Sequence, residues 1–258
     1  MFKKLTTMHI NQQSTYKHRL YESYSDPEKA FNVVLEMLET IDDLGYEGYI
    51  VGGAVRDMIL DVPCDDYDIV TNLPFEKMKK LGDISGRISR DGNDILFIKR
   101  DGLLIDVKRI SPKKTFEEEL LSRDLTINAM SWSPLTNKMI DPLGGEEDTK
   151  NHILHFTEES LKKVSSGKSF ILVLRLIRFH STLSFSISEE SIKALYNFSK
   201  KCKRKSITNG RFKNNYKKLL EGQSAKSALY LLKSLDLYDF CEQKWDELKD
   251  TEDEQNEA

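Results

Sequence analysis

Hydrophobic residues in the first part of the chain switch between helical and strand-like spacing. Apolar residues recur at helical intervals from Ala30 to Ile41, and Ser25, Asp26 and Pro27 ahead of them are typical of a helix start. Further segments alternate, or form short apolar runs bounded by turn residues. We expect strands at residues 49–51, 66–70, 84–89, 94–99, 103–110 and 153–156, a hairpin at 132–140, and helices at 54–60, 73–81, 116–121 and 123–129.

Beyond residue 157 the apolar positions follow helical spacing, and no segment is predicted to be a strand. Helices are expected at residues 169–180, 189–199, 211–220 and 224–235. The predicted fold class is therefore α+β, with a small mixed β-sheet flanked by helices in an N-terminal head, followed by an all-α neck and body. The expected divisions are a flexible arm at 1–24, the head at 25–157, the helical region at 158–245 and a frayed acidic tail at 246–258.

Composition fits a globular protein that does not cross a membrane. The 258 residues are 39% hydrophobic and 31% charged, with a net charge of −3. No apolar run approaches the roughly 18 residues of a membrane span, and residues 1–15 lack the apolar core of a secretory signal. Three widely separated cysteines predict a reducing compartment without structural disulfides, so we expect a cytoplasmic location.

Asp66 and Asp68 are the first candidates for chemistry. Side chains alternate along a strand, so both carboxylates would lie on one face while Tyr67 and Ile69 face the core. Two nearby carboxylates can hold a hard cation such as Mg²⁺ through oxygen. A solvated turn after Pro63 is the alternative, because a short Asp-x-Asp motif alone is weak.

The segment before the aspartates favours the binding of a phosphate. Gly52-Gly53 follows the strand at 49–51 and allows the backbone to approach a ligand closely. The predicted helix after it would direct free N–H groups toward an anion, and Arg56 adds a charged fork for phosphate oxygens. A strand, a glycine turn, a helix with an arginine and a carboxylate pair together suit a nucleoside triphosphate bound with its metal.

Further polar residues lie on later segments. Asp106 shares a strand face with Leu104 and Lys108, so a neighbouring strand could bring it beside the first two aspartates. Arg123, Asp124 and Asn128 could line one side of a helix start and offer hydrogen bonds to a ribose or phosphate. The alternatives are an ordinary exposed strand residue for Asp106 and a capping cluster on a surface helix for the other three.

Arg175 and Arg178 lie three residues apart on an otherwise apolar helix. Arginines in such a setting are buried only when paired, which predicts an anionic partner, either a protein carboxylate or a phosphate.

Charge is distributed unevenly near the C-terminus. Nine of the nineteen residues from Lys200 to Lys218 are Lys or Arg, and none is acidic. With Phe212 and Tyr216 among them, this segment could bind RNA phosphates and stack a base. The candidate RNA-binding residues are Lys203, Arg204, Lys205, Arg211 and Lys213. A solvated helix face accounts for the same charges equally well.

Several motifs, in order, resemble the class II tRNA nucleotidyltransferase/poly(A) polymerase family, which includes the CCA-adding enzymes. They are Gly52–Asp57, Asp66–Thr71, Leu104–Arg109, Arg123–Met130 and Asp141–Gly145. Leu174–Phe179 resembles the arginine-bearing helix that closes the nucleotide site of the family, and Ser206–Leu220 more weakly resembles the helical segment that follows it. The resemblance extends from about residue 30 to residue 235. Each motif is modest, but their order makes the match specific.

The resemblance implies template-independent addition of nucleotides from NTPs, CTP and ATP, to an RNA 3′ end, most often that of tRNA. It implies two Mg²⁺ ions on Asp66 and Asp68, one activating the RNA 3′-hydroxyl and the other neutralising the pyrophosphate leaving group. Asp106 would stand at the third carboxylate position, where the family usually has Glu. The implied nucleotide contacts are Gly52, Gly53 and Arg56 for the triphosphate, Arg123, Asp124 and Asn128 for ribose and phosphates, and Arg175 and Arg178 from the neck.

The chain departs from the family where the incoming base is selected. Lys168, Ser169 and Leu172 occupy positions where the family has Glu, Asp and Arg, and the last two of those family residues read the base edge. A serine and a leucine cannot reproduce two complementary hydrogen-bonding edges. Ser122 replaces a further arginine, and Gly210 replaces a glutamate that often precedes the arginine matched by Arg211. Besides faithful C-C-A addition, the altered positions allow three alternatives: addition of A only, addition of a single nucleotide, or addition with relaxed nucleotide selection.

Two other function classes compete with an RNA nucleotidyltransferase. A non-catalytic RNA-binding relative would explain the altered base-selecting positions, but clustered carboxylates repel one another without a metal and would then only cost stability. A nucleotidyltransferase acting on a protein or small molecule would keep the aspartates, and the basic segment Lys200–Lys218 is only weak evidence against it.

Overall fold

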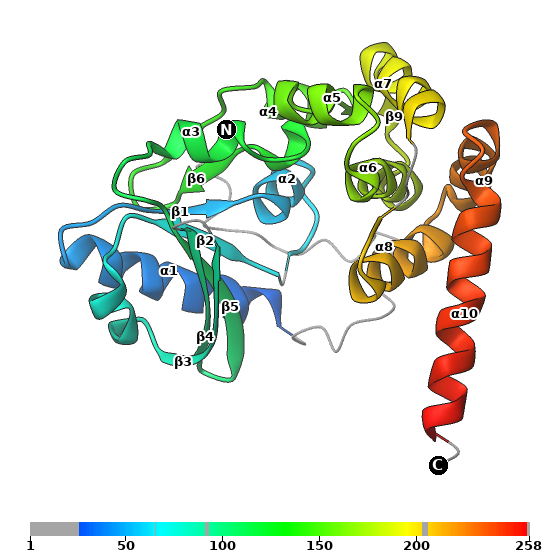
Figure 1. The fold of residues 1–258 in the computed structure, drawn as a ribbon. Coiled ribbons are helices and arrows are strands. Elements are labelled where there is room, and N and C mark those ends of the chain that lie inside the picture. The colour runs from blue at the N-terminus through cyan, green and yellow to red at the C-terminus, as the bar shows by residue number, and fades with distance from the viewer. Residues whose placement is uncertain (1–25, 65, 91–92, 203–205, 257–258) are drawn as a thin grey trace. The chain divides into compact units, whose positions relative to one another are not determined.

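The computed structural model describes residues 26–64, 66–90, 93–202 and 206–256. These residues form two compact units (Figure 1). The first contains the described residues up to Thr115 together with Ser131–Ile140, and the second contains Phe116–Met130 and the described residues from Asp141 onward. The predicted arm at 1–24 lies outside the described residues, as do Lys203, Arg204 and Lys205.

The first unit is built on a mixed seven-stranded sheet with the strand order β3-β4-β5-β2-β1-β6-β7. The β2–β5 pair is parallel and the other pairs are antiparallel, so the predicted mixed sheet is confirmed. The strands are β1 (Gly48–Val51), β2 (Asp68–Thr71), β3 (Asp83–Arg90), β4 (Asn93–Arg100), β5 (Leu103–Arg109), β6 (Ser131–Ser133) and β7 (Lys138–Ile140).

Helix α1 (Pro27–Asp43) runs along the sheet in Figure 1. Asp26 is its N-cap and accepts a hydrogen bond from the Lys29 N–H at 3.1 Å, as the sequence predicts. The apolar stripe of α1 is buried, and the Phe31 ring lies 6.2 Å from the Tyr67 ring of the segment leading into β2. Tyr67 and Ile69 thus face the core, which leaves the alternate positions of this segment to the opposite face.

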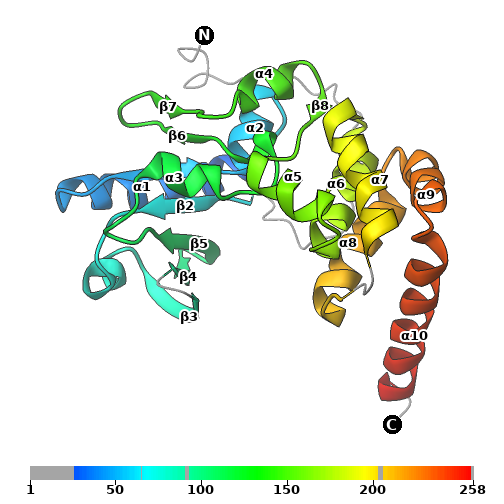
Figure 2. The ribbon, with the colours of Figure 1, turned by 45° about the horizontal axis from the view of Figure 1, so that its top comes forward.

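The second unit is mostly helical, with α6 packed against α8 and α9, and α5 against α7 (Figure 2). The four helices predicted at 169–180, 189–199, 211–220 and 224–235 are confirmed within a few residues. The helices are α3 (Phe116–Leu121), α4 (Gly145–Lys150), α5 (Glu158–Ser165), α6 (Phe170–Leu183), α7 (Glu189–Lys201), α8 (Asn209–Glu221), α9 (Ala225–Ser234) and α10 (Tyr238–Asn256).

Some local predictions are wrong. The segment at 123–129 is not an α-helix but holds a single 3₁₀ turn, η3 (Thr126–Asn128), because Leu125 is extended and bridges Phe156. The expected helix at 73–81 is the 3₁₀ helix η2 (Phe75–Lys80). The strand predicted at 153–156 is present as β8 (Ile153–Leu154), but its partner β9 (Ser186–Ile187) lies in the region expected to lack strands.

The C-terminal end also differs from expectation. Residues from 246 onward were expected to fray, but helix α10 continues to Asn256. Among the described residues, no helix is long and apolar enough to cross a membrane. The three cysteines are present as thiols, with Cys64 and Cys241 buried and Cys202 partly exposed.

Candidate active site

A glycine turn and an aspartate are brought together by the pairing of β1 with β2. Gly52 follows β1 directly and has φ 73° and ψ −131°, a conformation that a residue with a side chain rarely adopts. The antiparallel register places Val51 opposite Asp68. The turn at Gly52-Gly53 therefore begins one residue from the partner of Asp68, which is the arrangement predicted from the sequence.

The parallel pairing of β2 with β5 brings in the third carboxylate. Asp106 is the register partner of Asp68, and neighbouring strands lie about 4.8 Å apart. Register partners direct their side chains to the same face of a sheet. Asp66 lies two residues before Asp68, is exposed, and has its backbone carbonyl 3.4 Å from the Cys64 Sγ. The register thus places Asp106 beside Asp68, with Asp66 two residues away along the chain, and this is one of the two alternatives that the sequence leaves open for Asp106.

Electrostatics support this proximity. Burial and then the charge of Asp66 raise the pKa of the half-buried Asp106 carboxyl above its usual value. A bound cation would remove this penalty, because it favours the ionised form of every carboxylate that it contacts.

Among the described residues, no group of three or more His, Cys, Asp and Glu side chains is placed so that it could hold a metal ion, so the three aspartates do not form a metal site by themselves. Magnesium, however, commonly uses only one or two carboxylates and takes its remaining ligands from water and substrate phosphates. The oxygen-only donor set and the mutual repulsion of the carboxylates therefore fit Mg²⁺ bound together with a triphosphate.

Arg56 is more enclosed than the sequence suggests. It lies on helix α2 (Gly53–Ile59) and is 8% exposed. Its guanidinium contacts the Asp57 carboxylate at 2.7 Å, and a Cβ added to Gly53 would lie 3.4 Å from an Arg56 nitrogen. The guanidinium thus lies close to the glycine turn. A direct contact with the triphosphate stays a prediction.

The second unit contains a separate polar cluster centred on Asp124. The Arg175 Nε lies 2.5 Å from the Asp124 Oδ2, so the predicted anionic partner of Arg175 is a protein carboxylate in this structure. Burial alone would raise the pKa of Asp124, but the Arg175 charge and hydrogen bonds from Arg175 and Asn128 hold this pKa below its usual value. Asp124 is therefore a fixed, ionised acceptor.

Arg123 and Asn128 belong to the same cluster. The Arg123 guanidinium donates to the Asn128 carbonyl at 3.3 Å and lies 3.9 Å from the Glu119 carboxylate. Its buried Nε has no hydrogen-bond partner among the described residues. Thr157 holds the segment in place, since its hydroxyl donates to the Arg123 carbonyl at 2.6 Å. The structure thus brings three of the predicted nucleotide contacts, Arg123, Asp124 and Asn128, together with Arg175.

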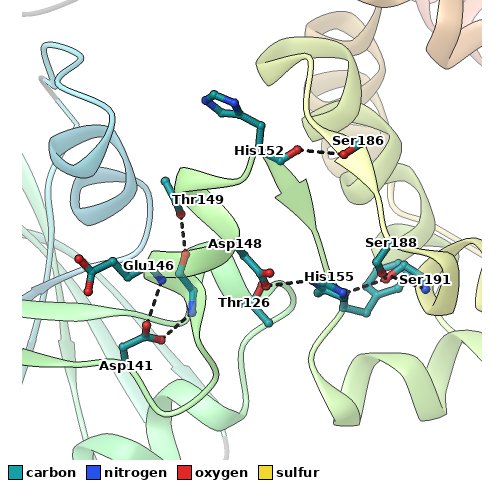
Figure 3. A network of polar contacts seen from close by, with 12 residues as sticks. Thr126, Asp141, Glu146, Asp148, Thr149, His152, His155, Ser186, Ser188 and Ser191 are labelled. Atoms are coloured by element: carbon teal, nitrogen blue, oxygen red, sulfur yellow. Dashed lines mark hydrogen bonds and ion pairs between the residues drawn. The ribbon is translucent and has the colours of Figure 1, made fainter.

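A network that the sequence did not suggest positions the 3₁₀ turn η3 (Figure 3). The Thr126 hydroxyl donates to the Asp148 carboxylate at 2.6 Å, and the His155 Nδ1 lies 3.0 Å from the same oxygen. The Thr126 N–H also donates to the His155 carbonyl at 3.1 Å. These residues are far apart in the sequence, and no spacing signal connects them. The network fixes the turn that carries Asn128.

Close packing supports the same turn. A Cβ on Gly145, the first residue of α4, would lie 2.2 Å from the Thr126 carbonyl oxygen. The Asp141 carboxylate accepts the Gly145 N–H at 2.8 Å and the Glu146 N–H at 2.9 Å (Figure 3). The predicted loop Asp141–Gly145 is thus a capped helix start that allows α4 to approach η3.

The start of α6 holds the residues that depart from the family pattern. Ser169 precedes the helix with φ 65° and accepts the Leu172 N–H on its carbonyl at 3.0 Å, while Lys168 is exposed. Ser169 makes no side-chain capping hydrogen bond. Further along α6, the Arg178 guanidinium lies 3.7 Å from the centre of the Phe179 ring.

Of the candidate RNA-binding residues that the structure describes, Arg211 is exposed on α8 and Lys213 is partly exposed one residue beyond Phe212. Phe212 and Tyr216 are buried and stack on each other, so the interleaved aromatic residues form part of the helical core and are not surface stacking platforms.

Comparison with known proteins agrees with this geometry. The sequence profile of the Poly A polymerase head domain matches residues 48–99 and 99–155. The CCA-adding enzyme of Geobacillus sp. (strain WCH70) is 30% identical in an alignment of 224 positions, which covers 81% of this chain and 54% of that enzyme. The chain thus spans about half the length of the curated relatives that it matches.

Solved structures show the same fold. The CCA-adding enzyme of Bacillus stearothermophilus in complex with CTP matches with a TM-score of 0.66 at 27% identity, over 81% of this chain and 53% of that one. The CCA-adding enzyme of Thermotoga maritima complexed with tRNA matches with a TM-score of 0.63 at 26% identity, over 81% and 52%.

The sheet, its aspartates and the following helices define a nucleotidyltransferase head with a helical neck and body. Residues 48–155 match a Poly A polymerase head domain, and the chain is similar to CCA-adding enzymes, which are members of the class II tRNA nucleotidyltransferase/poly(A) polymerase family.

Proposed function

We propose that the protein is a template-independent RNA nucleotidyltransferase that adds nucleotides from CTP and ATP to an RNA 3′ end, most plainly in CCA addition or repair on tRNA. The observation that carries the proposal is the register of β2 and β5, which makes Asp106 the neighbour of Asp68 with the charge of Asp66 close by. The likeness to CCA-adding enzymes solved with CTP and with tRNA supports the choice of substrates.

Asp66 and Asp68 would hold Mg²⁺, and Asp106 would complete the acidic face. The metal, when bound, supplies activation of the attacking hydroxyl and neutralises charge on the leaving pyrophosphate. The backbone at Gly52-Gly53 approaches the triphosphate closely because no side chain intervenes. Arg56 contributes its positive charge from a position close to this turn.

The cluster around Asp124 would bind the sugar and the phosphates. Asp124 is held ionised by Arg175 and can accept hydrogen bonds from ribose hydroxyls, while Arg123 and Asn128 offer donors. Arg178 adds a second arginine on the same helix. No side-chain nucleophile is required, since positioning and charge stabilisation account for most of the catalysis of phosphoryl and nucleotidyl transfer.

The identity of the added nucleotides depends on the start of α6. Lys168, Ser169 and Leu172 offer fewer matched hydrogen-bonding groups to a base than the Glu, Asp and Arg of the family pattern. CCA addition remains the proposal that the relatives favour, and A-only addition is the second candidate. The three cysteine thiols suit a reducing compartment, and we propose a cytoplasmic location on that ground.

The test is incorporation of labelled nucleotides into tRNA transcripts that end before the terminal C-C-A, with Mg²⁺ and each NTP alone or mixed, followed by sequencing of the product 3′ ends. We expect addition by the wild-type protein and a loss of at least about 100-fold in Asp66→Ala and Asp68→Ala. Asp83→Ala is the matched control, since Asp83 is exposed at the start of β3, and it should react normally.

Each competing class predicts a different result. Products ending in adenosine alone would replace CCA addition by A-only addition. RNA binding that persists without Mg²⁺ and without turnover would indicate a non-catalytic relative. Activity on a protein or small molecule that survives charge reversal at Arg211 and Lys213 would point away from RNA as the substrate.

A further inference from the structure

A cavity of about 280 Å³ lies on the second unit between α8 and α10. The two helices pack side by side (Figures 1 and 2). On α8 the lining side chains fall at intervals of four residues, Lys213, Lys217 and Glu221, and therefore share one face. On α10 the lining side chains include Trp245 and Lys249, one turn apart. The apolar lining residues are Leu220 of α8 and Leu248 of α10.

The Trp245 ring is held in place from behind. Tyr216 of α8 is fully buried and meets the Trp245 ring edge-on at 5.6 Å. The Tyr216 hydroxyl donates to the Glu242 carboxylate of α10, and burial together with Glu242 raises the pKa of Tyr216, so this donor stays protonated. Lys244 of α10 adds a hydrogen bond to the Asn209 side chain at 2.8 Å. The Trp245 ring is therefore held in position by contacts within the protein before any ligand binds.

The charge of the lining is unbalanced. Three lysines and one glutamate surround the cavity, although the whole chain carries a net charge of −3. The Lys249 ammonium lies over the Trp245 ring, 5.3 Å from its centre, so a base that stacks on this face must displace it. An aromatic ring with ammonium groups around it suits a flat π-system that carries a phosphate, because base stacking and phosphate contacts are the two elements of single-strand recognition.

We propose that this cavity binds one unpaired nucleotide of the RNA substrate, with its base on Trp245 and its flanking phosphates on Lys213, Lys217 and Lys249. The cavity lies just below the range of about 300–1,000 Å³ typical of small-molecule pockets, which suits a single base. This inference rests on the proposed function, since it names where the RNA of that reaction is gripped. Lys213 and Lys217 belong to the basic segment Lys200–Lys218, so the proposal assigns two lysines of this segment to a defined RNA-binding site.

The experiment measures binding of a tRNA transcript lacking its terminal C-C-A, at several salt concentrations, by the full chain and by variants. Trp245→Ala should weaken binding about tenfold and raise KM for RNA, whereas Trp245→Phe, which keeps an aromatic face, should stay within about threefold of the wild type. Lys217→Ala should reduce the slope of log K against log salt by about 0.7. Lys226→Ala, an exposed lysine on α9 outside the cavity, is the charge control and should leave the slope unchanged.

A second readout is independent of any folding defect in the alanine variant. RNA should quench the tryptophan fluorescence of the wild-type protein, and this quenching should disappear in Trp245→Phe, in which Trp132 is the remaining tryptophan. Unchanged RNA binding in Trp245→Ala together with unchanged quenching in Trp245→Phe would overturn the proposal. So would self-association of the wild-type chain that Trp245→Ala abolishes without altering RNA binding, because the cavity would then hold a second copy.

The two proposals can fail separately. If the wild-type protein adds no nucleotide to any RNA but binds RNA through Trp245, the nucleotidyltransferase activity is refuted and the cavity is supported. If it adds nucleotides and Trp245→Ala binds and reacts like the wild type, the activity stands and the cavity is refuted.

Discussion

The ion pair between Arg175 and Asp124 gives the sharpest prediction for stability. Replacing Arg175 by Met keeps much of the side-chain volume but leaves the 12%-exposed Asp124 carboxylate without its cation. Removing one partner of a fully buried pair costs about 3–5 kcal/mol. The Arg175 side chain is 38% exposed, so solvent screening lowers the expected loss to about 2 kcal/mol, a fall in Tm of about 4–8 °C.

The pH dependence of that loss follows from the direction of the pKa shift. In the wild-type protein the folded pKa of Asp124 lies below its unfolded value, so the ionised carboxylate stabilises the fold above about pH 4, and this contribution is lost as pH falls through the folded pKa. Without Arg175, burial would raise the pKa of Asp124. The deficit of Arg175→Met should therefore be largest at neutral pH and shrink as pH is lowered toward about 4.

Thermal unfolding followed by circular dichroism at several pH values measures these effects. The double variant Asp124→Asn/Arg175→Met should recover part of the loss at neutral pH, because the buried charge is gone. Lys193→Met is the control, since Lys193 lies 3.6 Å from Glu189 in an exposed pair on α7 and should cost well under about 1 kcal/mol. A loss in Arg175→Met that is pH-independent, or as small as that of Lys193→Met, would refute the reasoning.

Three further predictions test the supports of the site. Gly145→Ala should lower stability by about 1–3 kcal/mol and weaken CTP binding, because its Cβ would lie 2.2 Å from the Thr126 carbonyl oxygen; thermal unfolding and calorimetric titration with CTP check both effects. Asp148→Ala should cost about 1–3 kcal/mol and raise KM for NTPs, because Thr126 and His155 lose a shared acceptor; unchanged kinetics would show that the network does not position the turn. Asp106→Asn should raise the Tm of the metal-free protein by about 1–2 °C at neutral pH, because the raised pKa of Asp106 means that its ionised form is destabilised in the folded protein. This gain in Tm should fade below about pH 4, and nucleotide incorporation by the variant should fall. A lower Tm at neutral pH would contradict the reasoning.

The sheet was predictable from the sequence because its strands are short and bounded by clear turns. The alternation at Asp66–Ile69 correctly assigns Tyr67 and Ile69 to the core and the aspartates to the opposite face. The sequence leaves the pairing of β2 with β5 open, since parallel neighbours need no particular sequence spacing. The convergence of the three carboxylates therefore depended on tertiary structure.

Other features of the site were hidden because they depend on packing between distant segments. The turn η3 replaces a predicted helix because the extended Leu125 pairs with Phe156, which no local propensity reveals. Arg56 reads as a free phosphate ligand in the sequence, but its contact with Asp57 and its place close to Gly53 appear only in three dimensions. Aromatic residues among lysines suggested base stacking, whereas Phe212 and Tyr216 are core residues and Trp245 faces the cavity.

The central claim is that Asp66 and Asp68 bind a divalent cation together with the triphosphate. The most direct measurement is the binding of Mn²⁺, a paramagnetic substitute for Mg²⁺, followed by electron paramagnetic resonance with and without CTP and in the absence of RNA. The account predicts binding that CTP strengthens, and affinities at least about tenfold weaker in Asp66→Asn and Asp68→Asn but unchanged in Asp83→Asn. Equal Mn²⁺ affinity in the wild-type protein and in both site variants would contradict it.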